Sequence, residues 1–304
     1  MKEPYFPFPD SVKRIGIAVS SKAPEHDAFH NAVNFLQSYG IACVVPTHAL
    51  ESGPEDYFAT DERRRAEDFN SLLADTSIQL ILCARGGYGS GYLLDSINWD
   101  LLRKRALPVC GYSDITALHC GMFAHHAGVP VTTQMLTSLS QVVENEFTAR
   151  SMKRTLQIAM GESVPEMNYR LNVISNPRNQ SVTAPFFAAN LAVLTSLCGT
   201  KHLPDFQNTI IAVEDVDESP RKIDRMLLQM DLCGIFDRAA AVLFGKFSGD
   251  CGTDEEQIRI MRRFADRHPN KPFFSGLPFG HTLPSLSFLC GRCVTITCDG
   301  ILTM

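Results

Sequence analysis

The chain has 304 residues, of which 45% are hydrophobic and 20% charged, and its formal net charge is −5. This length and composition are typical of a globular protein with two domains of ordinary size. The mild negative charge excludes a nucleic-acid surface, which needs a basic patch, and no segment reaches the roughly 18 apolar residues of a membrane span. The first nine residues, MKEPYFPFP, lack the apolar stretch of a secretory signal, so we expect a cytoplasmic location.

The ten cysteines do not follow a disulfide or metal pattern. Most lie in or beside apolar runs, where a reduced cysteine behaves as a small hydrophobic residue. Cys290 and Cys293 form a lone Cys-x-x-Cys, whereas a structural zinc site needs a second pair of ligands at suitable spacing. We therefore expect reduced thiols, no metal and no other cofactor.

The first half alternates between apolar strands and amphipathic helices. Strands are predicted at 12–20, 41–46, 78–84, 107–111 and 129–133, and helices at 25–40, 61–75 and 114–128. The basic run Arg63-Arg64-Arg65 is interleaved with acids and is interpreted as a solvated helix face. Near-continuous apolar strands between helices indicate a parallel sheet covered on both faces. In such a sheet, ligands bind at the carboxyl ends of the strands.

The second half has its own pattern. Periodicity fades in a polar stretch, which places a junction at 166–180 between an N-terminal domain at 1–165 and a smaller C-terminal α/β domain at 181–304. In the C-terminal part, helices are predicted at 188–199, 219–230 and 253–268, and strands at 209–213, 239–247 and 293–297.

Ser113 lies at the corner between a predicted strand and a predicted helix, in the sequence Gly-Tyr-Ser-Asp. A serine there presents its hydroxyl at the carboxyl end of the strand, as in a nucleophile elbow. The N–H groups of the next helical turn, beginning with that of Asp114, have no intrahelical acceptor and can stabilise an oxyanion. The alternative is that Ser113 or Asp114 only caps the helix.

A glycine-rich loop, Arg85-Gly-Gly-Tyr-Gly-Ser-Gly, directly follows the strand predicted at 78–84. Its spacing differs from the Gly-x-Gly-x-x-Gly of dinucleotide sites, and no acid follows at the required distance. Glycines let a backbone approach a substrate closely and offer N–H groups, so this loop could complete an oxyanion hole with the amide of Asp114. The alternatives are an ordinary tight turn and a nucleotide-binding loop.

Glu214 and His281 are the other two members of a candidate triad. Glu214 follows the strand predicted at 209–213, within the run Glu-Asp-Val-Asp-Glu, although such acidic runs are usually solvated loops. His281 ends the loop Gly-Leu-Pro-Phe-Gly-His and is one of nine histidines. With Ser113 they offer a nucleophile, an acid and a base, and such triads are recognised by role rather than by chain order.

Four motifs, taken together and in this order, resemble those of the LD-carboxypeptidases. This serine peptidase family includes murein tetrapeptide carboxypeptidase and the microcin C immunity peptidase. The motifs lie at 85–90, 111–118, 214–227 and 276–281, and the resemblance covers residues 14–300. It implies an N-terminal parallel-sheet domain of the flavodoxin or amidotransferase kind, a smaller C-terminal α/β domain, and an active site in the cleft between them.

The resemblance also implies roles for individual residues. The implied triad is Ser113, His281 and Glu214. The implied oxyanion hole consists of the backbone amides of Gly86, Gly87 and Asp114. Contacts to the substrate are expected from Arg85, Tyr88 and Asn190. The implied enzyme is a homodimer that hydrolyses, without a cofactor, the amide between an L-centre and a C-terminal D-amino acid.

The expected substrate is a muropeptide tetrapeptide that loses its terminal D-Ala during peptidoglycan recycling. The alternatives are an aminoacyl nucleotide analogue of the microcin type, or no turnover at all in a muropeptide- or nucleotide-binding module. A nucleotide needs an aromatic platform, yet Trp99 is interpreted as a core residue and the segment 250–256 has no aromatic residue. Thr133-Gln134 and Ala188-Ala189 depart from the Gly-Pro and Gly-Gly of the family pattern, which leaves the substrate open.

Overall fold

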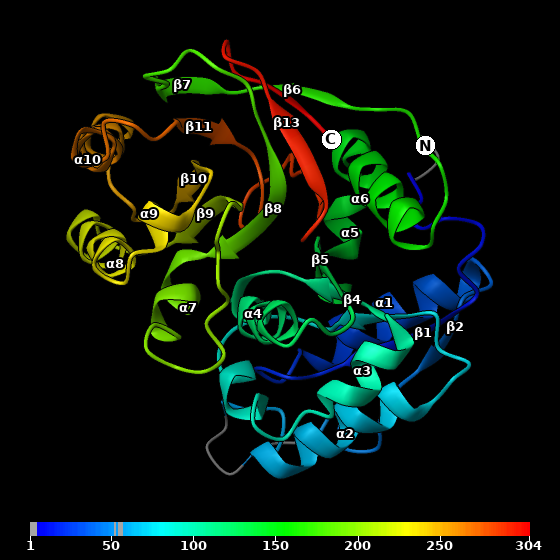
Figure 1. Ribbon diagram of the computed structural model, residues 1–304. Helices are drawn as coiled ribbons and strands as arrows, with labels where there is room; N and C mark the ends of the chain where they lie inside the picture. The colour runs from blue at the N-terminus through cyan, green and yellow to red at the C-terminus, as the bar shows by residue number, and fades with distance from the viewer. Residues whose placement is uncertain (1–4, 52, 54–56) are drawn as a thin grey trace.

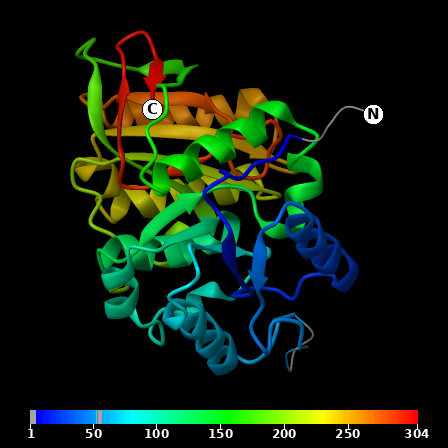
Figure 2. The same cartoon turned by 90° about the vertical axis from the view of Figure 1, so that its right-hand side faces the viewer.

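The structure is a computed structural model that describes residues 5–51, 53 and 57–304 (Figure 1). Residues 1–4, on which part of the signal-peptide argument rests, lie outside the described residues. The chain folds into two lobes, each built on a sheet, and Figure 2 shows the N-terminal lobe below the C-terminal one. The predicted class, α/β with a parallel N-terminal sheet and a second α/β domain, is confirmed.

The first lobe contains a sheet with the strand order β12-β5-β4-β3-β1-β2 in the described part of the chain, in which β12 is Phe288–Leu289. Its parallel strands are β1 (Arg14–Ala18), β2 (Ala42–Val44), β3 (Leu80–Cys83), β4 (Pro108–Gly111) and β5 (Val129–Thr132). Strands β3 and β4 are buried throughout, because helices pack on both faces. One face is covered by α1 (His26–Ser38), α5 (Leu139–Val142) and α6 (Glu146–Ala159). The other is covered by α2 (Glu62–Ala74), α3 (Trp99–Arg105) and α4 (Thr116–Ala124).

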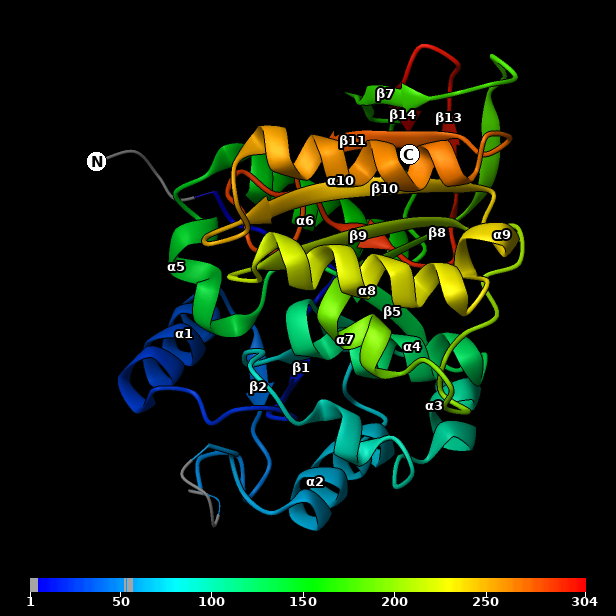
Figure 3. The same ribbon diagram turned by 90° about the vertical axis from the view of Figure 1, so that its left-hand side faces the viewer.

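The second lobe contains a mixed, barrel-like sheet with the order β6-β14-β13-β8-β9-β10-β11-β7. Its parallel centre consists of β8 (Val182–Asn190), β9 (Ile210–Val216), β10 (Ala241–Ser248) and β11 (Phe273–Leu277). Antiparallel strands flank this centre: β13 (Cys293–Ile296), β14 (Ile301–Thr303), β6 (Asn168–Arg170) and β7 (Asn172–Ser175). Helices pack on its outer face (Figure 3): α8 (Pro220–Leu232), α9 (Ile235–Arg238) and α10 (Asp254–Arg267).

The two lobes are joined by more than the linker between them. One hydrophobic cluster runs from α2 and α4 of the first lobe to α7 (Leu191–Ser196) and α8 of the second. The chain that follows His281 then returns to the first lobe, where β12 (Phe288–Leu289) pairs antiparallel with β5. On the way, the N–H of Ser287 donates to Ser151 Oγ of α6 at 2.9 Å. This returning segment, residues 282–290, is called the strap below.

Three predicted elements need correction. The helix predicted at 188–199 begins only at Leu191, because residues 188–190 end strand β8. That end of β8 is buried on both faces, so it lacks the alternation of a half-exposed strand, and its alanines favour a helix interpretation. The strand predicted at 209–213 continues to Val216, so Glu214 lies within β9 rather than after it. The helix predicted at 114–128 ends at Ala124 and is preceded by a 3₁₀ turn over Ser113–Ile115.

The polar segment at 166–180 is not a simple linker, because β6 and β7 form within it and pair at the edges of the second sheet. Short, largely exposed edge strands carry little apolar signal, which is why periodicity did not reveal them. The predicted domain limits at 165 and 181 stay a prediction. The other predicted strands and helices agree with the observed ones to within a few residues, as element boundaries usually do. The sequence analysis gave no range for α3, α5, α6, α9, β11 and β14.

Candidate active site

Ser113 occupies the turn between β4 and α4, as predicted. Its φ of +62° lies in the left-handed region, which is unusual for a residue with a side chain and typical of strained turns at functional sites. In the described part of the chain, the backbone N–H of Asp114 makes no backbone hydrogen bond. Strand, strained turn and helix together place the hydroxyl of Ser113 in a cavity at the carboxyl end of β4.

His281 and Glu214 complete a hydrogen-bonded relay with Ser113. Nε2 of His281 lies 3.1 Å from Oγ of Ser113, and its Nδ1 lies 2.8 Å from Oε2 of Glu214. The backbone N–H of His281 also donates to Oε2 at 3.2 Å. Glu214 is 1% exposed, so its carboxylate acts on the imidazole with little screening by solvent. These three side chains come from different elements and are brought together as the sequence analysis expected.

The protonation of His281 is set by opposing effects. Burial disfavours the charged imidazolium, but the hydrogen bond and the charge of Glu214 outweigh it and raise the pKa of His281 above its ordinary value. The charges of Asp215 and Asp217 add to this effect. A base with a raised pKa accepts a proton readily, and the same charges stabilise the imidazolium that results.

Three residues outside the relay hold Glu214 and the His281 turn in place. The amide of Asn190 donates to Oε1 of Glu214 at 3.3 Å and to Oδ1 of Asp215 at 2.9 Å. The amide of Gln134, from the first lobe, donates to the carbonyl of Gly280 at 3.2 Å. Gly280 itself is required, because a Cβ there would lie 2.4 Å from Cδ of Glu214. Asn190 therefore contacts Glu214 directly, and Gln134, one of the departures from the family pattern, supports the loop that carries His281.

The glycine-rich loop packs directly against Ser113. A Cβ at Gly86 would lie 2.9 Å from Cβ of Ser113 and 3.0 Å from its Oγ, so only glycine permits this approach. In the described residues the N–H groups of Gly86 and Gly87 make no backbone hydrogen bond, which leaves them available near the hydroxyl. Gly86 therefore lies against Ser113, and Gly87 and Asp114 line the same cavity as Ser113.

A buried polar network fixes this loop to the serine turn. The carboxylate of Asp114 accepts hydrogen bonds from the N–H of Ser90 at 2.8 Å and from Oγ of Ser21 at 2.6 Å. Arg65, which is 2% exposed, donates to the carbonyls of Ser20 at 2.7 Å and Gly89 at 3.1 Å. The interpretation of the 63–65 run as a solvated face is therefore wrong for Arg65. Arg65 precedes the buried Phe69 and Leu72 by four and seven residues, and residues with this spacing share one face of a helix. This spacing could have predicted that Arg65 lies on the buried face of α2.

The relay opens into a cavity of about 590 Å³ between the two lobes. The glycine-rich loop forms one wall with Tyr88 and Tyr92, which are 50% and 53% exposed and share a hydrogen bond of 3.1 Å between their hydroxyls. Helix α7 forms the opposite wall. Of the predicted substrate contacts, Tyr88 and Asn190 line this cavity, whereas Arg85 does not and reaches the carbonyl of Ala23 at 3.5 Å.

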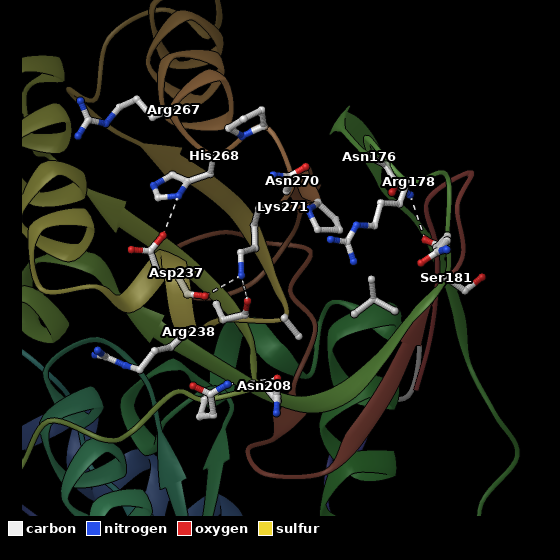
Figure 4. A pocket seen from close by; sticks show the side chains of 17 residues that line it. Asn176, Arg178, Ser181, Asn208, Asp237, Arg238, Arg267, His268, Asn270 and Lys271 are labelled. Atoms are coloured by element: carbon white, nitrogen blue, oxygen red, sulfur yellow. Dashed lines mark hydrogen bonds and ion pairs between the residues drawn. The ribbon is translucent and has the colours of Figure 1, made fainter.

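A second cavity of about 560 Å³ lies at the other end of the second lobe, before the strands β9, β10 and β11 begin (Figure 4). It is rich in basic side chains, but most of them already have partners. Lys271 donates to the carbonyls of Asp237 and Ala239, and Arg267 and His268 both bind Asp231. No residue of the Ser113 relay lines this cavity, so it is not the place of the candidate chemistry.

Trp99 is partly buried and packs against the hydrophobic core, in agreement with its interpretation as a residue that serves core packing. Its ring stacks on His125 with centroids 4.7 Å apart, and its Nε1 donates to the carbonyl of Leu94 at 3.0 Å. Across the described ranges, no cluster of three or more His, Cys, Asp or Glu is arranged to hold a metal ion. In the same residues, no helix has the length and apolar character needed to cross a bilayer.

Fold and site together define a two-domain α/β protein with a Ser–His–Glu relay in the cavity between its lobes. Family models for the N-terminal and C-terminal domains of LD-carboxypeptidases match residues 15–133 and 183–296. The chain is 32% identical over 234 residues to a putative carboxypeptidase of Synechocystis, covering 74% of this chain and 72% of that protein. It belongs to the LD-carboxypeptidase family.

Two further proteins to which the chain is similar carry different names. A probable murein peptide carboxypeptidase of Bacillus subtilis is 26% identical over 281 residues, which cover 91% of this chain and 86% of that protein. A solved structure of MccF, the microcin C7 self-immunity protein of Escherichia coli, in complex with glutamyl sulfamoyl guanosine, superposes with a TM-score of 0.83. That likeness covers 99% of this chain and 98% of the MccF chain at 20% identity, so it shows the shared fold.

Proposed function

We propose that this protein is a serine-type LD-carboxypeptidase in which Ser113 is the nucleophile, His281 the base and Glu214 the acid of a catalytic triad. The observation that carries this proposal is the continuous relay from Oγ of Ser113 through the imidazole to the buried carboxylate, at 3.1 and 2.8 Å. At 3.1 Å from Oγ, Nε2 is within the range in which a base can take a proton from a serine, and at 2.8 Å the carboxylate can orient the imidazole through a hydrogen bond.

The chemistry follows from that relay. His281 Nε2 takes the proton of Ser113 as Oγ attacks the scissile carbonyl, and the amides of Gly86, Gly87 and Asp114 stabilise the resulting oxyanion. The imidazolium then protonates the leaving amine, which departs as the free C-terminal amino acid. Water, deprotonated by the same imidazole, hydrolyses the acyl-serine and restores the hydroxyl. Glu214 holds the proton of the imidazole on Nδ1 throughout, which leaves Nε2 free to accept one.

The substrate that we favour is a muropeptide tetrapeptide, from which the enzyme releases D-Ala. Membership of the family and the name of the Bacillus subtilis relative support this substrate class. A cavity of about 590 Å³ is large enough to receive the peptide residues on the acyl side of the scissile bond.

A second candidate is an aminoacyl nucleotide analogue of the kind bound in the MccF structure. The tyrosine wall favours it, because the half-exposed Tyr88 and Tyr92 offer the aromatic surface on which a base can stack. Trp99 and the segment 250–256 offer no aromatic platform, but the loop beside Ser113 carries one in Tyr88 and Tyr92.

Turnover of three compounds by the same preparation separates these functions. We expect the tetrapeptide L-Ala-D-Glu-meso-diaminopimelate-D-Ala to lose D-Ala, and the pentapeptide ending in D-Ala-D-Ala to be cut poorly. The variant Ser113→Ala should cleave neither peptide, while its melting temperature stays at the wild-type value. Faster hydrolysis of an aminoacyl sulfamoyl adenosine than of the tetrapeptide would replace the muropeptide with the nucleotide analogue. Tight binding without any turnover would leave only a binding module.

We also propose that the enzyme acts in the cytoplasm, as a homodimer, without a metal or organic cofactor. Light scattering on the purified protein tests the dimer, and mass spectrometry of the native protein tests for a bound nucleotide or flavin. Residues 166–180 are proposed as the region in which the two domains meet along the chain.

A further inference from the structure

The second cavity, before the amino ends of β9, β10 and β11, differs in charge from the protein around it. The chain has a net charge of −5. Among the described residues, however, the cavity is lined by four arginines and lysines and by one carboxylate, that of Asp237. We call it the basic cavity, after Arg178, Arg238, Arg267 and Lys271. An anion is attracted to such a lining, and concave walls strengthen the attraction.

Two of the four cations are already paired with acids outside the lining. Nε of Arg267 donates to Oδ2 of Asp231 at 2.7 Å, and this aspartate is 8% exposed. Nε of Arg238 lies 3.4 Å from Oδ1 of the more exposed Asp205. These pairs neutralise much of the charge of both guanidinium groups, so Arg178 and Lys271 are the cations left for a ligand.

Lys271 has backbone partners but no carboxylate beside it. Its Nζ donates to the carbonyls of Asp237, at 3.0 Å, and of Ala239. An ammonium has three donors, so one is left for a ligand. The carboxylate of Asp237 lies 3.3 Å from Nδ1 of His268 instead. Burial lowers the pKa of Lys271, and the charge of Asp237 opposes this effect only in part. An anion next to Nζ would therefore stabilise the charged form.

Arg178 reaches the basic cavity from the connection between β7 and β8. Figure 4 shows its guanidinium extending toward the segment that carries Asn270 and Lys271. Within the described ranges, Arg178 takes part in no ion pair and no hydrogen bond through its side chain. A guanidinium can bind two oxygens of one phosphate group, which a point charge such as an ammonium cannot do.

The rest of the polar lining consists largely of side-chain amides, which both donate and accept hydrogen bonds. Oδ1 of Asn176 is buried and has no hydrogen-bond partner in the part of the chain that the structure describes. Hydroxyl groups of a ligand match such amides, because they too can donate and accept. The amides belong to Asn176, Gln180, Gln207, Asn208 and Asn270.

We propose that the basic cavity binds a small molecule with a phosphate monoester on a polyhydroxylated frame, a sugar phosphate or a nucleoside monophosphate. Arg178 and Lys271 bind the phosphate, and the amides bind hydroxyl groups of the frame. The volume of about 560 Å³ is within the range of small-molecule sites, and a cavity of this shape suits a small molecule better than the flat surface of a protein. The site is separate from Ser113 and does not depend on the proposed carboxypeptidase function.

Titration calorimetry on the wild-type protein at low ionic strength tests this proposal. The ligands are glucose 6-phosphate and AMP, with glucose, adenosine and inorganic phosphate for comparison. Hydrogen bonds to a charged group contribute about 10- to 100-fold in affinity. We expect at least one phosphorylated compound to bind at least tenfold more tightly than both its unphosphorylated counterpart and inorganic phosphate. The tighter of the two phosphorylated compounds then identifies the frame.

The variant Arg178→Gln locates the binding. Arg178 lies in an exposed turn and holds no other side chain, so we expect the variant to keep the wild-type melting temperature and to bind the ester at least tenfold more weakly. Arg225→Gln is the matched control. It removes the same charge from an exposed residue of α8 that does not line the cavity, and it should keep the wild-type affinity.

Three results would overturn the proposal. The first is no binding of either phosphorylated compound at millimolar concentration, and the second is equal affinity of the wild type and Arg178→Gln. The third is binding of inorganic phosphate as tightly as both esters, which would leave no role for the amides. Ser113→Ala should bind the ester as the wild type does, whether or not the wild type releases D-Ala. A loss of binding in that variant would place the ligand beside Ser113 and would also overturn the proposal.

Discussion

Replacing Glu214 with glutamine tests the relay most directly, because the side chain keeps its size but loses its charge, and an NH₂ group replaces one of its two acceptor oxygens. Oε2 accepts from both Nδ1 and the backbone N–H of His281, and Oε1 accepts from the amide of Asn190. If the glutamine keeps its oxygen toward His281, its NH₂ group faces the NH₂ group of Asn190, so two donors face each other. In the opposite orientation, the NH₂ group faces the backbone N–H and Nδ1 of His281, which are both donors. The imidazole would then have to carry its proton on Nε2, where it cannot accept the proton of Ser113. The first orientation is therefore the less costly one.

In that orientation the geometry of the relay persists, and the loss is electrostatic. A carboxylate 2.8 Å from Nδ1 stabilises the imidazolium by about 3–4 kcal/mol at the effective dielectric constant of protein sites. Its removal should lower kcat by about 100- to 1000-fold. It should also lower the pKa of His281, which the charge of Glu214 raises, so the acid limb of kcat/KM moves to lower pH.

The assay is release of D-Ala from the tetrapeptide between pH 5 and pH 9. Glu166→Gln, at an exposed residue that does not line the cavity, is the control for loss of a negative charge. Thermal melts of each variant separate effects on chemistry from effects on folding. A loss of less than tenfold, with the acid limb unmoved, would show that Glu214 does not act through His281 and would refute the reasoning.

Four further outcomes are expected. Because only the neutral imidazole can accept a proton, wild-type kcat/KM should rise with pH through an apparent pKa above the ordinary histidine value, and an acid limb below that value contradicts this. Gly86→Ala should lower kcat by about 100-fold by displacing the Ser113 turn, whereas Gly91→Ala, where a Cβ meets nothing within 4 Å, should leave kcat nearly unchanged. Gln134→Leu should lower kcat with little change in KM, because the His281 turn loses its support; a change confined to KM would instead place Gln134 in substrate binding. Activity should survive chelators and thiol reductants, and loss in EDTA restored by zinc would reveal a metal requirement.

The five parallel strands of the first lobe and its helices α1, α2 and α4 could be predicted from the sequence, because buried parallel strands form continuous apolar runs separated by helices. The helices α3, α5 and α6 of the same lobe were not predicted. The end of β8 could not be predicted, since Ala188 and Ala189 favour a helix locally and only burial between two layers makes them strand. Strands β6 and β7 were hidden for the opposite reason. They lie at the sheet edges, where polar residues are tolerated.

The residues of the relay were found because each lies in a motif, and the motifs gain their meaning from their order. Residues that support the relay carry no such signal. Gln134 acts through an amide that reaches Gly280 across 146 positions of the chain, and Arg65 acts through carbonyls of loops that are distant in sequence. Contacts of this kind depend on the tertiary fold, and a single sequence contains no pattern from which to predict them.

The strap limits how the gene for this protein can recombine. His281 is encoded with the second lobe, yet the residues that follow it are bound to α6 and to β5 of the first. A recombination event that replaced the gene segment for either lobe would have to preserve the pairing of β12 with β5. It would also have to preserve the apolar surfaces through which the two lobes contact each other. The two halves are thus constrained to descend together, and neither can be recombined as an independent module.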